Sequence, residues 1–80
     1  MVQQSMRILR RPQVEQKIGL SRSAIYERLD PESRYYDPQF PKPITLGNGK
    51  NPPVGWIEAE IDGWLNVQVQ RSRQAVEVAA

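Results

Sequence analysis

Four polar side chains lie close together at residues 21–26, and their types suit hydrogen bonding to nucleic acid. An arginine guanidinium donates two parallel hydrogen bonds to guanine O6 and N7, and hydroxyl groups donate to phosphate oxygens. If this stretch opens a helix, the free N–H groups of its first turn also favour an anion. We therefore expect Arg22 to read a base edge and Ser21 to meet a phosphate. Ser23 and Tyr26 are expected to contact a phosphate or a base edge.

Two charged residues follow on the same predicted helix. Arg28 is expected to contact a phosphate or to form a salt bridge. Glu27 has two interpretations, because a carboxylate accepts a hydrogen bond from cytosine N4 but also pairs with a nearby arginine. The pairing is the favoured interpretation.

A second polar group lies in the turn-forming string GNGKNPP at residues 47–53. Here Asn48, Lys50 and Asn51 are expected to contact the DNA backbone or the minor groove. The string is not a Walker phosphate loop, which requires glycine where Ile44 stands and serine or threonine at position 51. The pattern instead indicates the tip of a hairpin.

Helical spacing of apolar residues predicts the elements that position the first group, at residues 12–18 and 22–29. Gly19 suits the end of the first helix, because glycine adopts positive φ without a Cβ penalty. Ser21 offers an N-cap to the second helix, and Pro31 ends it. This is the pattern of a helix-turn-helix. The same pattern also occurs in small helical domains that bind no DNA, so the remaining chain has to decide.

The rest of the chain predicts a wing and a third helix. Ile44 and Leu46 share one strand face, Val54 and Trp56 share another, and a short extended segment is expected near residues 7–9. The third helix is predicted from apolar residues at i, i+4, i+7 and i+8, namely Ile57, Ile61, Trp64 and Leu65.

The third helix is not expected to enter a groove, because its first turns are acidic and would repel phosphates. Both tryptophans are expected in the core. Gly63 costs about 1 kcal/mol in a helix interior relative to alanine, so we expect a close backbone approach there. Beyond residue 66 the helix is expected to continue for a turn or two and then fray. A less favoured alternative is a self-association surface made by Val67, Val69, Val76 and Val78.

The four-proline stretch at residues 30–43 predicts an extended loop. Its aromatic residues Tyr35, Tyr36 and Phe40 are expected to pack partly over the core. A base-stacking surface formed by the tyrosines is the less favoured alternative.

Composition excludes most catalytic chemistry. The 80 residues contain no cysteine and no histidine, which removes zinc sites, thiol and serine–histidine catalysis and disulfides. We therefore expect no enzyme activity, no metal and no cofactor. Residues 1–50 hold nine Lys/Arg against five Asp/Glu, and residues 51–80 hold two against four, so the basic half is the half that suits a polyanion. No apolar run is long enough for a membrane span or a signal peptide, and a cytoplasmic, nucleoid-associated protein is expected.

Several strings in order resemble the AlpA family of small phage and prophage transcriptional regulators, which are related to excisionases and MerR-type regulators. They are RILR at residues 7–10, GLSRSAIY at 19–26, FPKPI at 40–44, VGW at 54–56 and WL at 64–65. The resemblance implies a winged helix-turn-helix with residues 22–29 as the recognition helix. The sequence departs from the family pattern at three places. The stretch at 30–39 is longer, the wing tip is lengthened at 51–53, and Ala59 replaces a serine that is frequent at this position in the family.

The expected fold is mainly α with a small β-hairpin, a winged helix-turn-helix of three helices and a two-stranded wing. We expect residues 1–6 to form a flexible N-terminus, residues 7–66 the DNA-binding domain, and residues 67–80 a helix extension or flexible tail. The expected function is sequence-specific regulation of phage or mobile-element genes through double-stranded DNA. We expect double-stranded DNA as the partner, with several copies of the protein bound on repeated half-sites. An integrase or RNA polymerase is a possible protein partner. The alternatives are an excisionase-like DNA-bending protein and a protein-interaction adaptor.

Overall fold

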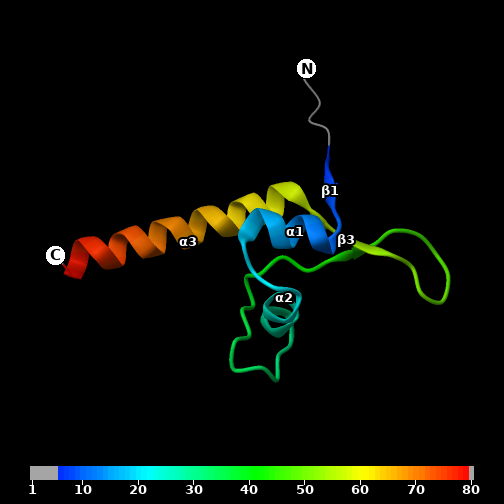
Figure 1. Ribbon diagram of the computed structural model, residues 1–80, viewed down its shortest axis with the longest axis horizontal. Helices are drawn as coiled ribbons and strands as arrows, with labels where there is room; N and C mark the ends of the chain where they lie inside the picture. Colours follow the sequence, from blue (N-terminus) through cyan, green and yellow to red (C-terminus); the bar gives the residue numbers. More distant parts are fainter. Residues whose placement is uncertain (1–5, 80) are drawn as a thin grey trace, which may run out of the picture.

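The computed structural model describes the backbone of residues 6–79 and the side chains of residues 6–74. Most of the expected N-terminal segment, and the side chains of Val76 and Val78, lie outside these residues. The elements in chain order are β1 (Ile8–Leu9), α1 (Arg11–Ile18), α2 (Arg22–Leu29), β2 (Ile44–Thr45), β3 (Val54–Ile57) and α3 (Glu58–Ala79) (Figure 1). Three helices and a hairpin confirm the expected fold class. None of the described helices is long and apolar enough to cross a membrane.

The turn between α1 and α2 forms as the sequence predicts. Gly19 has φ of 73° and donates its N–H to the Glu15 carbonyl at 2.8 Å. The hydroxyl of Ser21 accepts a hydrogen bond from the Ala24 N–H at 3.2 Å, which caps α2. At the other end of α1, the Arg10 backbone N–H donates to Gln13 Oε1 at 2.8 Å, so α1 begins at Arg11.

The sheet has three antiparallel strands in the order β1-β3-β2, where the sequence predicted a two-stranded hairpin and a short strand or extended segment near residues 7–9. Ile8 pairs with Ile57, and Ile44 pairs with Gly55. A Cβ on Gly55 would collide with the side chain of Ile8. Glycine in the central strand therefore allows β1 to lie against it.

The core lies where α1, α2 and α3 meet the sheet. Its buried side chains are Leu9, Val14, Ile25, Phe40, Trp56 and Ile61. Trp56 is fully buried and donates its indole N–H to the Pro41 carbonyl at 3.1 Å. Trp64 is only half-buried, packs edge-on against Phe40 at a centroid distance of 4.9 Å, and donates its indole N–H to Asp37 Oδ2 at 2.9 Å. The prediction of a core role is thus confirmed fully for Trp56 and in part for Trp64.

The loop at residues 30–43 folds on itself as a chain of turns. Asp30 and Asp37 each accept a hydrogen bond from the backbone N–H two residues later, at 2.9 Å. Phe40 is buried, as expected, but Tyr35 and Tyr36 remain 54% and 38% exposed. The expectation that these tyrosines pack over the core is wrong, because the turns satisfy the loop's own backbone and leave both rings outside.

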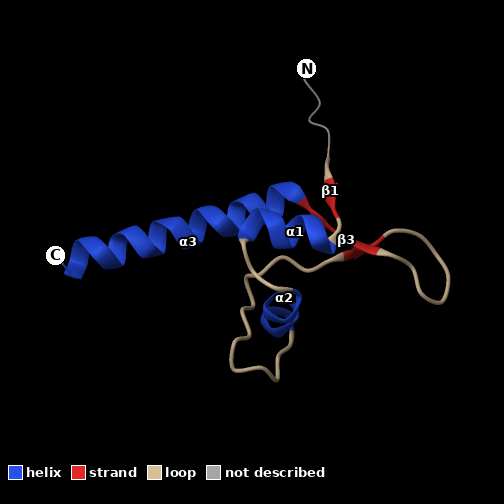
Figure 2. Cartoon of the chain, viewed as in Figure 1, coloured by secondary structure: helices blue, strands red, loops and turns tan. Residues whose placement is uncertain are grey.

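Helix α3 is longer than the sequence predicted and projects from the body of the fold (Figure 2). It has 22 residues and begins directly after β3. The expected close approach at Gly63 is wrong, since a Cβ built there would meet nothing within 4 Å. Val67 and Val69 are exposed.

Candidate nucleic-acid interface

The first predicted group is brought together on the exposed side of α2. Ser21, Arg22, Ser23 and Tyr26 are all exposed at the N-terminal end of this helix. The Arg22 guanidinium carbon lies 5.7 Å from the centroid of the Tyr26 ring, a cation–π distance. The two side chains, one turn apart, therefore form a single surface unit. The hydroxyl of Ser21 is already engaged in capping, which leaves its remaining lone pair and its proton for an external group.

Arg28 does not join this surface, because its side chain is hydrogen-bonded within α2. Its Nη1 donates to the Ala24 carbonyl at 2.9 Å within the same helix, and the side chain is half-buried. Within residues 6–74 neither Arg28 nor Glu27 forms a salt bridge. The expected ion pairs of both residues are thus not present in this part of the chain.

The second predicted group occupies the tip of the wing. Asn48, Lys50 and Asn51 are exposed in the loop that joins β2 to β3. The Leu46 N–H donates to the Pro53 carbonyl at 2.7 Å, and Gly47 takes a positive φ of 125° at the start of the loop. Figure 1 shows the wing and α2 as two separate projections from the fold. The structure therefore does not bring the two predicted groups into contact.

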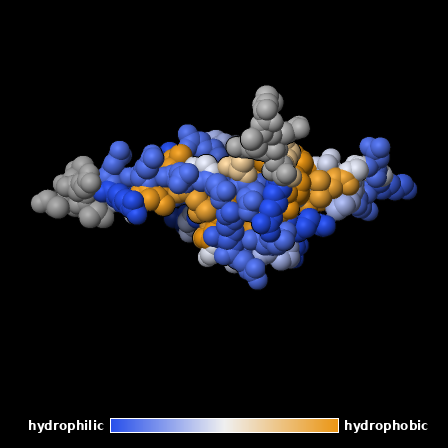
Figure 3. All heavy atoms as spheres, turned by 90° about the horizontal axis from the view of Figure 1, so that it is seen from above, coloured by the Kyte–Doolittle hydropathy of each residue, from blue (hydrophilic) through white to orange (hydrophobic). Residues whose placement is uncertain are grey.

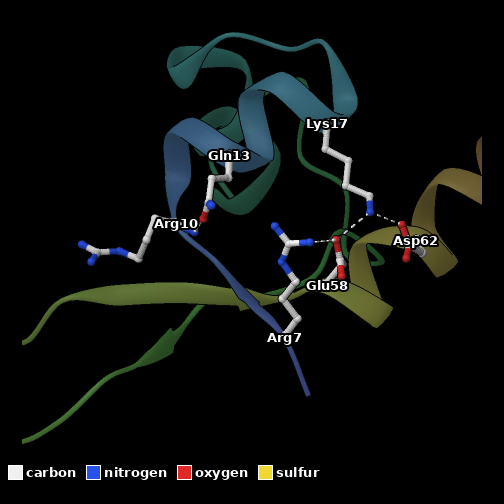
Figure 4. Close-up of polar contacts among 6 residues, drawn as sticks. All are labelled: Arg7, Arg10, Gln13, Lys17, Glu58 and Asp62. Atoms are coloured by element: carbon white, nitrogen blue, oxygen red, sulfur yellow. Dashed lines mark hydrogen bonds and ion pairs between the residues drawn. The ribbon is translucent and has the colours of Figure 1, made fainter. Parts of the chain in front are cut away.

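One exposed cation was missed by the sequence analysis. The backbone of Arg10 caps α1, while its guanidinium extends away from that helix in the direction in which the wing strands leave the fold (Figure 4). No salt bridge holds the Arg10 side chain among the described residues. The available signal was its position just before the helix start marked by Pro12, where the backbone is extended.

Three other cations on the same half of the chain, Arg7, Arg11 and Lys17, are paired with carboxylates. Lys17 Nζ lies 2.8 Å from Asp62 Oδ1 and 2.9 Å from Glu58 Oε2, and Arg7 lies 3.8 Å from the same Glu58 oxygen (Figure 4). Hydrogen bonds to Asp62 and then Glu58 raise the pKa of Lys17. The acidic first turns of α3 thus hold α1, a role that the sequence analysis did not assign.

Arg11 is likewise compensated, by Glu15 at 2.8 Å, and this hydrogen bond raises the pKa of Arg11. By contrast, Arg10, Arg22 and Lys50 have no carboxylate partner in the described part of the chain. Uncompensated positive charge therefore lies on α2, at the start of α1 and on the wing tip, and also in the long loop and on α3, where Arg34, Lys42, Arg71 and Arg73 form no salt bridge among the described residues.

Comparison with known proteins gives a consistent set of relatives. The family model described as Prophage CP4-57 regulatory protein (AlpA) matches residues 7–69. A protein of Escherichia coli K12 named "DNA-binding transcriptional activator AlpA" is 53% identical over 62 residues, which cover 78% of this chain and 84% of that protein. "Uncharacterized protein ORF88" of Enterobacteria phage P4 is 41% identical over 59 residues, which cover 74% of this chain and 57% of that protein. No solved structure matches the chain.

Proposed function

The chain belongs to the AlpA family of prophage regulatory proteins, and from this membership we propose that it is a transcriptional regulator that binds double-stranded DNA. The proposal rests on one observation above all, which is the Arg22–Tyr26 unit exposed at the N-terminal end of α2 without a carboxylate partner among the described residues. A free guanidinium at the start of the second helix of a helix-turn-helix is placed to read base edges.

In this mechanism α2 enters the major groove by its N-terminal end. Arg22 donates to guanine O6 and N7. Because the guanidinium is already stacked on Tyr26, it loses less conformational entropy on binding. The N–H groups of the first turn, with Ser21, meet a phosphate. Ser23 and the Tyr26 hydroxyl contact phosphate or a neighbouring base.

The wing contributes contacts that carry little sequence information. Lys50, flanked by Asn48 and Asn51, contacts the backbone or the minor groove. Arg10, which extends from the fold on the side of the hairpin, contacts a phosphate between the wing and α2. Arg28 supports α2 through its bond to the Ala24 carbonyl and reaches a phosphate only if that bond opens.

A domain of this size reads few base pairs, so two or more copies act on repeated half-sites in genes of a prophage or another mobile element. The protein works in the cytoplasm on chromosomal DNA. The name of the E. coli relative describes an activator, which favours contact with RNA polymerase over contact with an integrase.

The test is fluorescence anisotropy with random duplex DNA and with fragments of promoters next to the gene, at about 50–200 mM salt, where phosphate contacts are resolved. We expect salt-sensitive binding to all duplexes and binding at least about 1,000-fold tighter to one fragment. Equal affinity for every fragment would reject sequence-specific regulation and favour an architectural role. Absence of binding at the lowest salt would reject the DNA function altogether.

A further inference from the structure

An open groove of about 640 Å³ runs between α3 and the proline-rich end of the long loop. Phe40 and Ile44 line one wall, while Gly63, Trp64 and Val67 line the wall that belongs to α3. Ile44 is 38% exposed and Val67 is 36% exposed, so apolar surface remains in contact with solvent. The groove is separate from the exposed polar face of α2.

Two features of α3 have no explanation within a single chain. Glycine weakens a helix interior, yet the space around Gly63 is empty rather than filled by a neighbouring element. Moreover, every side chain from Val69 to Gln74 is exposed, and within the described part of the chain this stretch is tied to the rest of the fold by the bond from Arg71 to Gln39. A helical segment of this length is marginal in water without a packing partner. Figure 3 shows apolar atoms that continue along α3 beyond the body of the fold.

We propose that the groove binds α3 of a second copy of this chain, with the two helices antiparallel about a twofold axis. In such an arrangement the face of α3 that lines the groove of its own chain also packs into the groove of the partner, and the partner's α3 does the same in return. At 3.6 residues per turn, the positions of Glu60, Trp64, Val67 and Arg71 fall on one such face. Gly63 borders that face and allows the two helix backbones to approach closely.

Charge fixes the register of the pair. Glu60 is exposed near the start of α3, and Arg71 is exposed two-thirds of the way along it; neither forms a salt bridge among residues 6–74. Arg71 donates to the neutral amide of Gln39, at 3.2 Å, and its charge also acts on Asp37 without a salt bridge. An antiparallel register that sets Glu60 opposite Arg71 also sets Trp64 opposite Val67, because both pairs are centred between residues 65 and 66. One register therefore pairs the two charges and covers the exposed Val67 together with the half-buried Trp64.

The experiment is sedimentation equilibrium of the full chain without DNA, from about 1 µM to about 1 mM, a range that spans weak and moderate affinities. Because no DNA is present, failure here leaves the proposed regulatory function untouched. We expect a reversible monomer–dimer equilibrium. Val67→Glu places two like charges near the twofold axis and should weaken the dimer by at least about tenfold.

Charge exchange tests the register itself. Glu60→Arg and Arg71→Glu should each weaken the dimer by about tenfold, and the double variant should recover to within about threefold of the wild type. Arg73→Glu is the matched control, because residue 73 lies on the opposite face of α3 and is exposed. Circular dichroism checks that each variant keeps its helix content.

The outcomes separate the possible occupants of the groove. A wild-type chain that stays monomeric to the highest concentration would overturn the proposal and leave the groove to a different protein. A dimer that Arg73→Glu weakens as much as Arg71→Glu, or that the double exchange does not restore, would overturn the antiparallel register.

Discussion

The guanidinium of Arg22 lies over the ring of Tyr26, one helical turn away, at 5.7 Å from the ring centroid. The contact joins two side chains that the sequence marks only as separate polar residues. If Arg22 reads a base, as proposed, we expect that contact to depend on the Tyr26 ring as well as on the arginine itself.

Removal of the Arg22 side chain is expected to weaken binding to the specific site by about 1–3 kcal/mol and to relax sequence preference, which is the scale of one bidentate base contact. Anisotropy with the best duplex and with single-base variants of it measures both effects. If Arg22→Ala binds all these duplexes as the wild type does, α2 is not the element that reads the sequence.

Substitution of Tyr26 separates its ring from its hydroxyl. Tyr26→Phe keeps the ring beneath Arg22 and should cost specific binding little, whereas Tyr26→Ala should cost about 0.5–1 kcal/mol, the scale of an exposed cation–π contact. Competition anisotropy on the specific duplex measures the difference. A large loss in Tyr26→Phe would instead indicate that the hydroxyl makes the essential contact.

Arg10 and Lys50 are expected to behave as phosphate contacts. Arg10→Gln and Lys50→Ala should each weaken binding to specific and random duplexes alike and lower the slope of log affinity against log salt by about one unit. Arg73→Gln, at the far end of α3 from the wing, is the control and should leave the slope unchanged. A loss confined to the specific duplex would assign either residue to base reading.

Lys17 is expected to hold α1 to the start of α3. Because its pKa is raised in the folded state, by Asp62 first and then Glu58, its contribution is full below the unfolded-state pKa. The contribution is lost as the pH rises through the raised value. Thermal unfolding of Lys17→Met should show a lower midpoint than the wild type at neutral pH, and the difference should shrink at strongly alkaline pH. A difference that does not change with pH would assign the effect to packing of the lysine side chain.

Asp37 ties the long loop to α3. Burial would raise the pKa of Asp37, but the hydrogen bonds from the Trp64 indole and the Gln39 backbone N–H, with the charges of Arg71 and Arg28, outweigh burial and lower it. Its stabilisation is therefore present above the unfolded-state pKa and is lost as the pH falls through the lowered value. Asp37→Ala should cost about 1–2 kcal/mol in urea unfolding at neutral pH. Asp37→Ala should also change the fluorescence emission of Trp64, because it removes the hydrogen bond to the indole. Asp30→Ala is the control in the same loop and should not alter the emission, because Asp30 bonds the Glu32 backbone and not Trp64.

The sequence predicted best where a local rule determines the backbone. Gly19 and Ser21 fixed the end of one helix and the start of the next, because positive φ and capping depend on neighbours in the chain. Pairing of β1 with β3 was missed, since a two-residue strand carries no periodicity, and its partner is distant in sequence.

Side-chain partners were predicted less well for the same reason. The exposed positions of Tyr35 and Tyr36 follow from hydrogen bonds among the loop's own turns. The neutralisation of Lys17 requires α3 to lie beside α1, which no local pattern encodes. As a result the sequence indicated Arg22 and Lys50 as candidate contacts, but the fold was needed to add Arg10 and to show that Lys17 is paired with carboxylates.

The junction of β3 and α3 has a mechanical consequence. Ile57 ends the strand and Glu58 starts the helix with no residue between them, and the Glu58 N–H is fastened to the Arg7 carbonyl at 2.9 Å (Figure 2). The hairpin and the long helix thus follow each other directly in the chain, and β1 holds the point where they meet. We therefore expect a change in the tilt of β3 to change the direction in which α3 leaves the fold.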